Sequence, residues 1–132
     1  MAVIRLCLDT SAYSRLMRGQ QTLQERLEAA DEILLPVTML GEVYAGFQGG
    51  NRLEENLSLL SAFRGQPGVV IIDTTDNIAQ RYATIVATLR RQGTPIPTND
   101  IWIAAAALEN GGRMVAYDAH FEAVPGLIVE AP

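Results

Sequence analysis

The chain has 132 residues, of which 48% are hydrophobic and 19% charged, and its formal net charge is −5 at pH 7. This composition is typical of one globular domain, 1–132, and excludes a disordered chain. The negative charge argues against a protein that coats nucleic acid through bulk positive charge. No apolar run is long enough to span a bilayer, and the first residues lack the order of a signal peptide, so we expect no membrane association.

Several residue types that many enzymes require are missing or occur once. All ten basic residues are arginines, and without lysine the chain is neither a P-loop NTPase nor a Schiff-base enzyme. The single cysteine, Cys7, cannot form an internal disulfide and, within an apolar run, is expected to pack in the core. With His120 as the only histidine, Cys/His zinc sites are excluded as well. We expect a reducing, cytoplasmic location.

Apolar runs and helical spacing predict strands and helices that alternate along the chain. In chain order, we expect a strand at 3–8, a loop with a short helix at 9–19, a helix at 22–30, a strand at 32–37, helices at 38–47 and 51–63, a strand at 68–73, helices at 77–93 and 98–108, and strands at 113–118 and 127–130. The strands show no alternation of apolar and polar residues, and helices separate them along the chain. This pattern indicates a parallel sheet covered on both faces. We therefore predict an α/β three-layer sandwich with a central, mostly parallel sheet of four or five strands.

The sequence also predicts which residues cap three of the helices and which residues form the apolar face of one helix. Polar side chains are expected to cap three helices, namely Thr38, then Asp73 or Asp76, then Thr98 or Asn99. In the helix at 51–63, one apolar face is expected to comprise Leu53, Leu57 and Leu60, with Leu59 and Phe63 beside it.

Four acidic residues are expected to meet at one edge of this sheet. Asp9 follows the first strand and Asp118 ends the fourth, while Glu42 and Asp100 lie near the starts of two helices. Ligands of such sheets bind beyond the carboxyl ends of the strands, and helices that follow parallel strands start near that edge. Each acid alone also has a plainer explanation, because the helix dipole favours acids in the first turn and aspartate is common in turns.

Converging carboxylates need a counter-charge. Two carboxylates about 4 Å apart repel by roughly 4 kcal/mol at an effective dielectric constant near 20. Oxygen ligands suit Mg²⁺ or Mn²⁺, and such an ion polarises a phosphoryl oxygen and activates water. The four acids therefore point to phosphodiester hydrolysis, which needs no lysine, cysteine or histidine.

Four segments give the chain a resemblance that covers essentially its whole length. They are "LDTSAY" (8–13), "TMLGEVYAG" (38–46), "PIPTNDIWIAAAAL" (95–108) and "VAYDAHFEAVPGL" (115–127). In order and spacing they resemble the PIN-domain ribonucleases, specifically the VapC toxins of type II toxin–antitoxin systems. The resemblance implies a PIN-like fold with Asp9, Glu42, Asp100 and Asp118 as the active-site acids. Asp9 and Asp100 would be the principal metal ligands, Asp118 would complete the metal shell, and Glu42 would help hold a metal or position water.

The resemblance also implies supporting residues. Thr10 and Ser11 match a small hydroxyl after the first aspartate, and each could hydrogen-bond a carboxylate or cap a helix. The same two roles are open for Asn99. Some relatives have a further acid where this chain has His120, which puts a fifth carboxylate in doubt. Basic residues should guide RNA past the acidic pocket, and Arg15 and Arg18 are our first candidates.

The implied partners are an RNA substrate (tRNA, rRNA or mRNA), a cognate VapB-type antitoxin whose tail obstructs the acidic cleft, and a second copy in a homodimer.

Two other phosphoryl-transfer folds are disfavoured, because haloacid-dehalogenase-like phosphatases and response-regulator receivers both need a lysine. The alternative that stays open is a non-catalytic PIN-like module that binds RNA or a protein.

Overall fold

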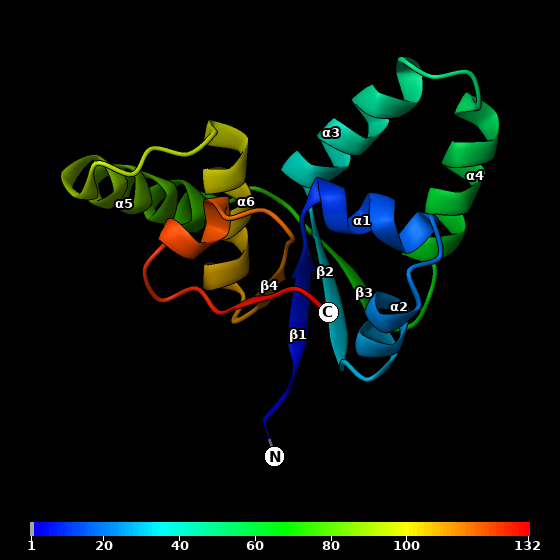
Figure 1. Cartoon of the computed structure of the whole chain (residues 1–132), viewed down its shortest axis with the longest axis horizontal. Helices are drawn as coiled ribbons and strands as arrows, with labels where there is room; N and C mark the ends of the chain where they lie inside the picture. Colours follow the sequence, from blue (N-terminus) through cyan, green and yellow to red (C-terminus); the bar gives the residue numbers. More distant parts are fainter. Residues whose placement is uncertain (1) are drawn as a thin grey trace.

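A five-stranded, fully parallel sheet forms the centre of the molecule, which is a computed structural model that describes residues 2–132 (Figure 1). The strand order is β3-β2-β1-β4-β5. The strands are β1 (Arg5–Leu8), β2 (Glu32–Pro36), β3 (Val69–Ile72), β4 (Arg113–Val115) and β5 (Val129–Glu130). The predicted α/β sheet and its five strands are confirmed, although the fourth strand ends at Val115 and not at residue 118.

Helices cover both faces of the sheet and complete the three predicted layers. They are α1 (Thr10–Met17), α2 (Gln21–Glu28), α3 (Val37–Gln48), α4 (Leu53–Arg64), α5 (Asp76–Gln92) and α6 (Thr98–Glu109), followed by the 3₁₀ helix η1 (His120–Ala123). In Figure 1, α5 and α6 lie on one side of the strands, and α1 to α4 lie on the other. This division follows from right-handed crossovers, because the chain moves outward from β1 to β3 and then returns across the sheet to β4.

The core lies on both sides of the central strand. Leu6, Cys7 and Leu8 in β1 are fully buried, so Cys7 packs in the core as predicted. On one face the sheet meets α6, which is buried almost all round; its buried residues are Ile101, Ile103 and the four alanines 104–107. A helix packed from several sides holds its first turn rigidly, and that turn contains Asp100.

The polar caps predicted for α3 and α6 are wrong. α3 begins at Val37 after Pro36, and α6 begins at Thr98 after Pro97, in both cases without a side-chain cap. Thr38, Thr98 and Asn99 therefore lie inside their helices. In both places a proline in the extended conformation, with φ near −60° and ψ of 141°, directs the chain into the helix one or two residues early.

The third helix start differs in another way. α5 is capped by Thr75, whose hydroxyl oxygen accepts a hydrogen bond from the backbone N–H of Ile78 at 3.3 Å. Asp76 is already the first helical residue and Asp73 lies outside the helix, so neither predicted cap is correct. Asp76 still benefits from the helix dipole.

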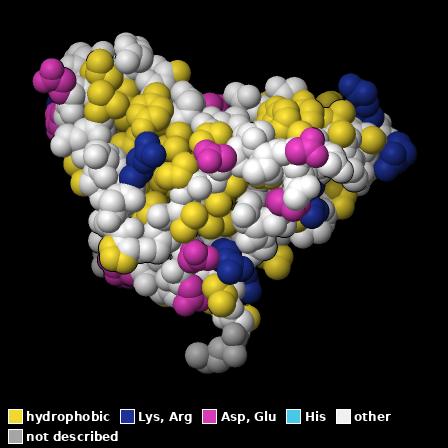
Figure 2. Space-filling view, turned by 180° about the vertical axis from the view of Figure 1, so that it is seen from behind, with side chains coloured by type: hydrophobic (Ala, Val, Ile, Leu, Met, Phe, Trp, Pro, Cys, Tyr) yellow, Lys and Arg dark blue, Asp and Glu magenta, His cyan; other side chains and the backbone are white. Residues whose placement is uncertain are grey.

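The apolar face predicted for α4 is only partly buried. Leu60 and Phe63 enter the core, whereas Leu57 and Leu59 are 38% and 49% exposed. The reason is that α4 packs mainly against α3 and the edge strand β3, so much of its surface faces outward. Seen from behind, hydrophobic side chains come to the surface over α3 and α4 (Figure 2). Within residues 2–132, no helix combines the length and apolar character that crossing a membrane requires.

Candidate active site

The four predicted acids line one open pocket at the carboxyl edge of the sheet. Asp9, Glu42, Asp100 and Asp118 surround a space of about 400 Å³. The rest of the lining consists of Thr10, Ser11, Ser14 and Arg18. Asp9 directly follows β1, Asp118 follows the end of β4, and Asp100 lies in the first turn of α6. Glu42 lies in the second turn of α3 because that helix begins earlier than predicted.

Asp9 is the most buried of these acids, with 4% of its surface exposed. It caps α1, since its Oδ1 accepts the backbone N–H of Ala12 at 2.8 Å, and the hydroxyl of Ser11 lies 3.2 Å from both carboxylate oxygens. Burial raises the pKa of Asp9 to about 6, although the Ala12 and Ser11 hydrogen bonds oppose this, and the charges of Asp118 and Asp100 add to it. The hydrogen bonds from Ala12 and Ser11 hold the carboxylate in place, while its burial disfavours the charged form.

Glu42 is held by residues from two other helices. The Thr10 hydroxyl at the start of α1 donates to its Oε1 at 2.7 Å, and the Asn99 amide in α6 donates to its Oε2 at 3.4 Å. Thr10, Ser11 and Asn99 therefore all donate hydrogen bonds to acids of the pocket. None of the three is the cap of its helix.

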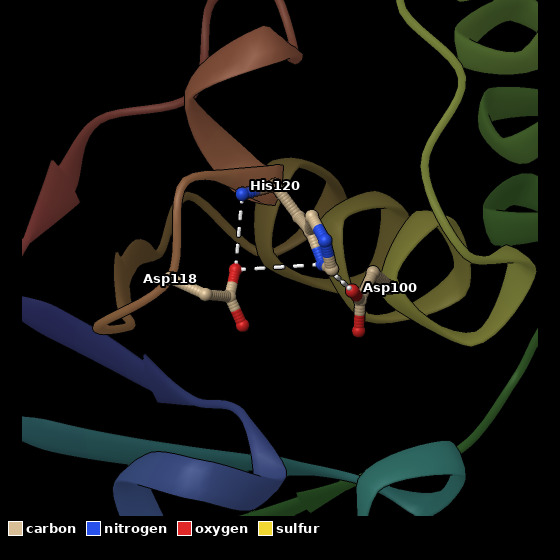
Figure 3. A group of neighbouring side chains, drawn as sticks. All are labelled: Asp100, Asp118 and His120. Atoms are coloured by element: carbon tan, nitrogen blue, oxygen red, sulfur yellow. Dashed lines mark hydrogen bonds and ion pairs between the residues drawn. The ribbon is translucent and has the colours of Figure 1, made fainter.

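Asp100 and Asp118 lie on either side of the His120 ring (Figure 3). The ring Nδ1 is 2.8 Å from Asp100 Oδ2 and 3.6 Å from Asp118 Oδ1, while the backbone N–H of His120 donates to Asp118 Oδ1 at 3.0 Å. Burial raises the pKa of Asp100, the His120 hydrogen bond and charge oppose this, and the charges of Asp118 and Glu42 add to it. His120 thus contacts two acids of the pocket, which sequence reasoning did not predict; its position two residues after Asp118 was the available signal.

The donor atoms of this pocket fit a divalent cation. One ligand atom from each of Asp100, Asp118 and His120 lies within 4.8 Å of the other two. Asp9 and Glu42 stand outside this tight group but line the same pocket. Carboxylate oxygens suit Mg²⁺ and Mn²⁺, and an imidazole nitrogen suits the later first-row metals. Burial, and to a smaller extent the neighbouring acids, raise the pKa of Asp9 and Asp100, and a bound cation would offset both effects.

The two arginines predicted near the pocket differ in environment. Arg18 is exposed, lines the acidic pocket and forms no ion pair within residues 2–132. Arg15 is half-buried, with its guanidinium carbon 4.0 Å from the centre of the Tyr117 ring and a 3.4 Å hydrogen bond to Gln20. Arg18 is therefore the more accessible of the two cations.

Comparison with known proteins gives matches over nearly the whole chain. Residues 6–127 match the family model described as the PIN domain. Ribonuclease VapC5 of Mycobacterium tuberculosis is 26% identical over 119 residues, which cover 90% of this chain and 87% of the relative.

Solved structures share the fold. The crystal structure of VapBC2 from Rickettsia felis, bound to a DNA fragment from their promoter, superposes with a TM-score of 0.87, 23% identity and coverage of 96% and 98% of the two chains. VapBC-5 from Mycobacterium tuberculosis, a member of the VapBC family of toxin–antitoxin systems, superposes with a TM-score of 0.72, 25% identity and coverage of 96% and 95%.

Proposed function

The chain belongs to the PIN-domain family, and we propose that it is a metal-dependent endoribonuclease toxin, a single PIN domain over 1–132, that a VapB-type antitoxin inhibits. The observation that carries the proposal is the convergence of Asp9, Glu42, Asp100 and Asp118 on one pocket. A relative named as a ribonuclease and a structural neighbour from a toxin–antitoxin system support it.

The proposed roles follow from the environment of each acid. Asp9, Asp100 and Asp118 would hold the divalent ion, for which we propose Mg²⁺ or Mn²⁺. The chemistry supplied by the bound ion is polarisation of a phosphoryl oxygen and a lowered pKa of water. Glu42, whose two oxygens accept from Thr10 and Asn99, would orient the attacking water. Ser11 would keep the Asp9 carboxylate in place.

RNA must approach this acidic pocket against its charge. Arg18 lies on the pocket wall, and its free guanidinium is proposed to bind a phosphate of the RNA backbone. For Arg15 a phosphate contact stays a prediction, because its guanidinium already stacks on Tyr117.

The antitoxin is proposed to occupy the groove beside the acids. This groove, of about 330 Å³, is lined on its apolar side by Tyr13, Met17, Val43, Phe47 and Leu59. It shares four lining residues with the acidic pocket, namely Thr10, Ser14, Arg18 and Glu42. A peptide seated there would reach the carboxylates, where an arginine side chain would pair with them.

We also propose a homodimer, which light scattering of the purified chain would test.

The decisive experiment is cleavage of total cellular RNA by the purified chain with Mg²⁺ or Mn²⁺. Asp9→Asn and Asp100→Asn should each lower the cleavage rate by at least about 100-fold, since even outer-shell changes at metal sites cost about 10- to 100-fold. Asp73→Asn, an exposed change outside the pocket, is the matched control. A chelator should abolish cleavage.

Two outcomes would contradict the proposal. Equal cleavage by the wild type and Asp9→Asn would refute the catalytic assignment. A wild type that binds RNA or the antitoxin tightly, yet cleaves no RNA with either ion, would identify a non-catalytic binding module.

A further inference from the structure

His120 stands among the acids of the pocket without a part in the function proposed above. We infer that His120 is a ligand of the metal ion, and that its imidazole shifts the site toward later first-row transition metals at the expense of Mg²⁺. The inference rests on the proposed function in that it concerns the same ion.

The distances in the pocket match a shared ion. Two ligands about 2.1 Å from one ion lie about 3.0 Å apart at a right angle and about 4.2 Å apart when opposite. The His120 Nδ1 is 2.8 Å from Asp100 Oδ2 and 3.6 Å from Asp118 Oδ1, and all three donor atoms lie within 4.8 Å of one another. Small side-chain rotations would therefore let all three bind one ion, and His120 and Asp118 are exposed enough to make them.

The fold positions the ring on this spot. His120 begins η1, and its backbone N–H is bonded to Asp118, so one tight turn presents both side chains. The next residue, Phe121, is fully buried and anchors η1 in the core beside α6, which contains Asp100. With a side chain that is 46% exposed, His120 is not a packed core histidine, and it faces Asp100 and Asp118 (Figure 3).

The choice of an imidazole changes which ion fits best. Mg²⁺ binds oxygen and demands near-ideal octahedral geometry, whereas imidazole suits Fe, Ni, Cu and Zn. Replacing one oxygen ligand with nitrogen therefore strengthens binding of Co²⁺, Ni²⁺ or Zn²⁺ more than binding of Mg²⁺.

The first test looks at the imidazole directly. His120 is the only histidine of the sequence, so an untagged chain labelled with ¹⁵N-histidine gives signals from one ring. Titration with Zn²⁺ should move the Nδ1 resonance to the position of a metal-bound nitrogen, with stoichiometric saturation. An Nδ1 resonance without this change at saturating Zn²⁺ would overturn the inference, because His120 would then only hydrogen-bond the acids.

The second test measures selectivity by calorimetry with Co²⁺ and Mg²⁺. His120→Ala should weaken Co²⁺ binding by about 10-fold or more and Mg²⁺ binding much less, since loss of a ligand costs at least what loss of an outer-shell partner does. His120→Asp should keep Mg²⁺ binding and lose the preference for Co²⁺, which also shows that the variant site is folded. Glu122→Ala, an exposed change in the same 3₁₀ helix, is the control.

An unchanged ratio of Co²⁺ to Mg²⁺ affinity in His120→Ala would contradict the inference. These measurements use no RNA, so they separate the two proposals. A chain that binds Zn²⁺ through His120 but cleaves no RNA would refute the proposed ribonuclease function and support His120 as a metal ligand. RNA cleavage without coordination by the imidazole would support the ribonuclease function and refute His120 as a ligand.

Discussion

At the scale of single residues, the electrostatic cost of the pocket falls on Asp9. Only 4% of the surface of this residue is exposed, and its carboxylate faces the charges of Asp118 and Asp100. Hydrogen bonds from Ala12 and Ser11 do not offset this, so its pKa rises to about 6. At neutral pH the ion-free chain therefore holds a buried negative charge that a bound cation would stabilise.

Asp9→Asn should reveal this cost as a pH-dependent change in stability. The pKa of Asp9 rises from 3.8 to about 6 on folding, so between these values the folded chain binds more protons than the unfolded one. The wild type should then lose stability as pH rises from about 4 to about 6, with the loss complete above that range. Asparagine keeps the Oδ1 acceptor without the charge. In urea unfolding with a chelator, it should be more stable than the wild type by about 1–3 kcal/mol at pH 7.5 and not at pH 4.

Asp73→Asn, at an exposed position, should show no such difference between the two pH values. Saturating Mg²⁺ or Mn²⁺ should stabilise the wild type more than Asp9→Asn, because the variant lacks one proposed ligand and therefore binds the ion more weakly in the folded state. An Asp9→Asn variant that is no more stable than the wild type at pH 7.5 would show that the burial of this carboxylate carries no net cost.

At the scale of helices and strands, the elements could be predicted from local pattern but their starts could not. Mostly apolar runs without alternation, such as β1, are typical of parallel strands, and they identified the sheet edge where Asp9 and Asp118 lie. Helix starts at Pro36 and Pro97 depend on backbone geometry and not on a capping side chain, so the search for polar caps placed them too late.

Burial and the full pocket needed tertiary information. The exposure of Leu57 and Leu59 reflects where α4 meets its neighbours, which helical spacing does not contain. His120 joins the pocket only because η1 turns back toward α6, and a four-residue 3₁₀ helix has no periodicity to detect. The four acids were predictable because they lie near strand ends and helix starts, and errors of one to three residues in those bounds still leave the acids at the same edge of the sheet.

Gly68 provides a test of the packing at the start of β3. Its φ is +82°, and a Cβ there would lie 2.9 Å from the backbone carbonyl oxygen of Asp31. Its own carbonyl accepts the backbone N–H of Ile33 at 2.8 Å, so the chain cannot move away without losing a β2–β3 contact. Gly68→Ala should lower the free energy of unfolding by about 2–4 kcal/mol, measured by urea denaturation.

Gly19 is the matched control. Its φ is +83°, but no atom of residues 2–132 lies within 4 Å of the position of a Cβ. Gly19→Ala therefore meets the same backbone strain without the clash and should cost about 1–2 kcal/mol. Equal losses in both variants would show that the approach of Asp31 contributes nothing.

At the scale of the whole molecule, the layers meet at one hollowed edge. α1 and α3 come from one face of the sheet and α6 from the other, and hydrogen bonds from Thr10 and Asn99 to Glu42 join them there. The surface is hollowed at the upper edge of the view in Figure 2, between the part formed by α3 and α4 and the part formed by α5 and α6. The groove proposed for the antitoxin, which Leu59 lines, shares Glu42 with the acidic pocket at this edge.

Gly46 offers a way to fill that groove without disturbing the fold. It lies in α3 on the groove wall, and nothing lies within 4 Å of the position of a Cβ. Gly46→Arg should fold at least as well as the wild type, since arginine favours a helix by up to about 1 kcal/mol over glycine. It should also obstruct an antitoxin segment and weaken its binding by at least about 10-fold, measured by calorimetry with the purified antitoxin, because an occupied groove loses its complementary contacts.

Gly41→Arg is the control, because Gly41 is an exposed glycine of the same helix with an equally open Cβ position and lies outside the groove lining. Antitoxin binding to this variant should match that of the wild type, and ribonuclease activity without antitoxin should persist in Gly41→Arg. If both variants bound the antitoxin as tightly as the wild type, the inhibitor would have to approach the acids from another side. If both lost binding equally, the added charge and not the groove would be responsible, since only position 46 narrows the path to Glu42.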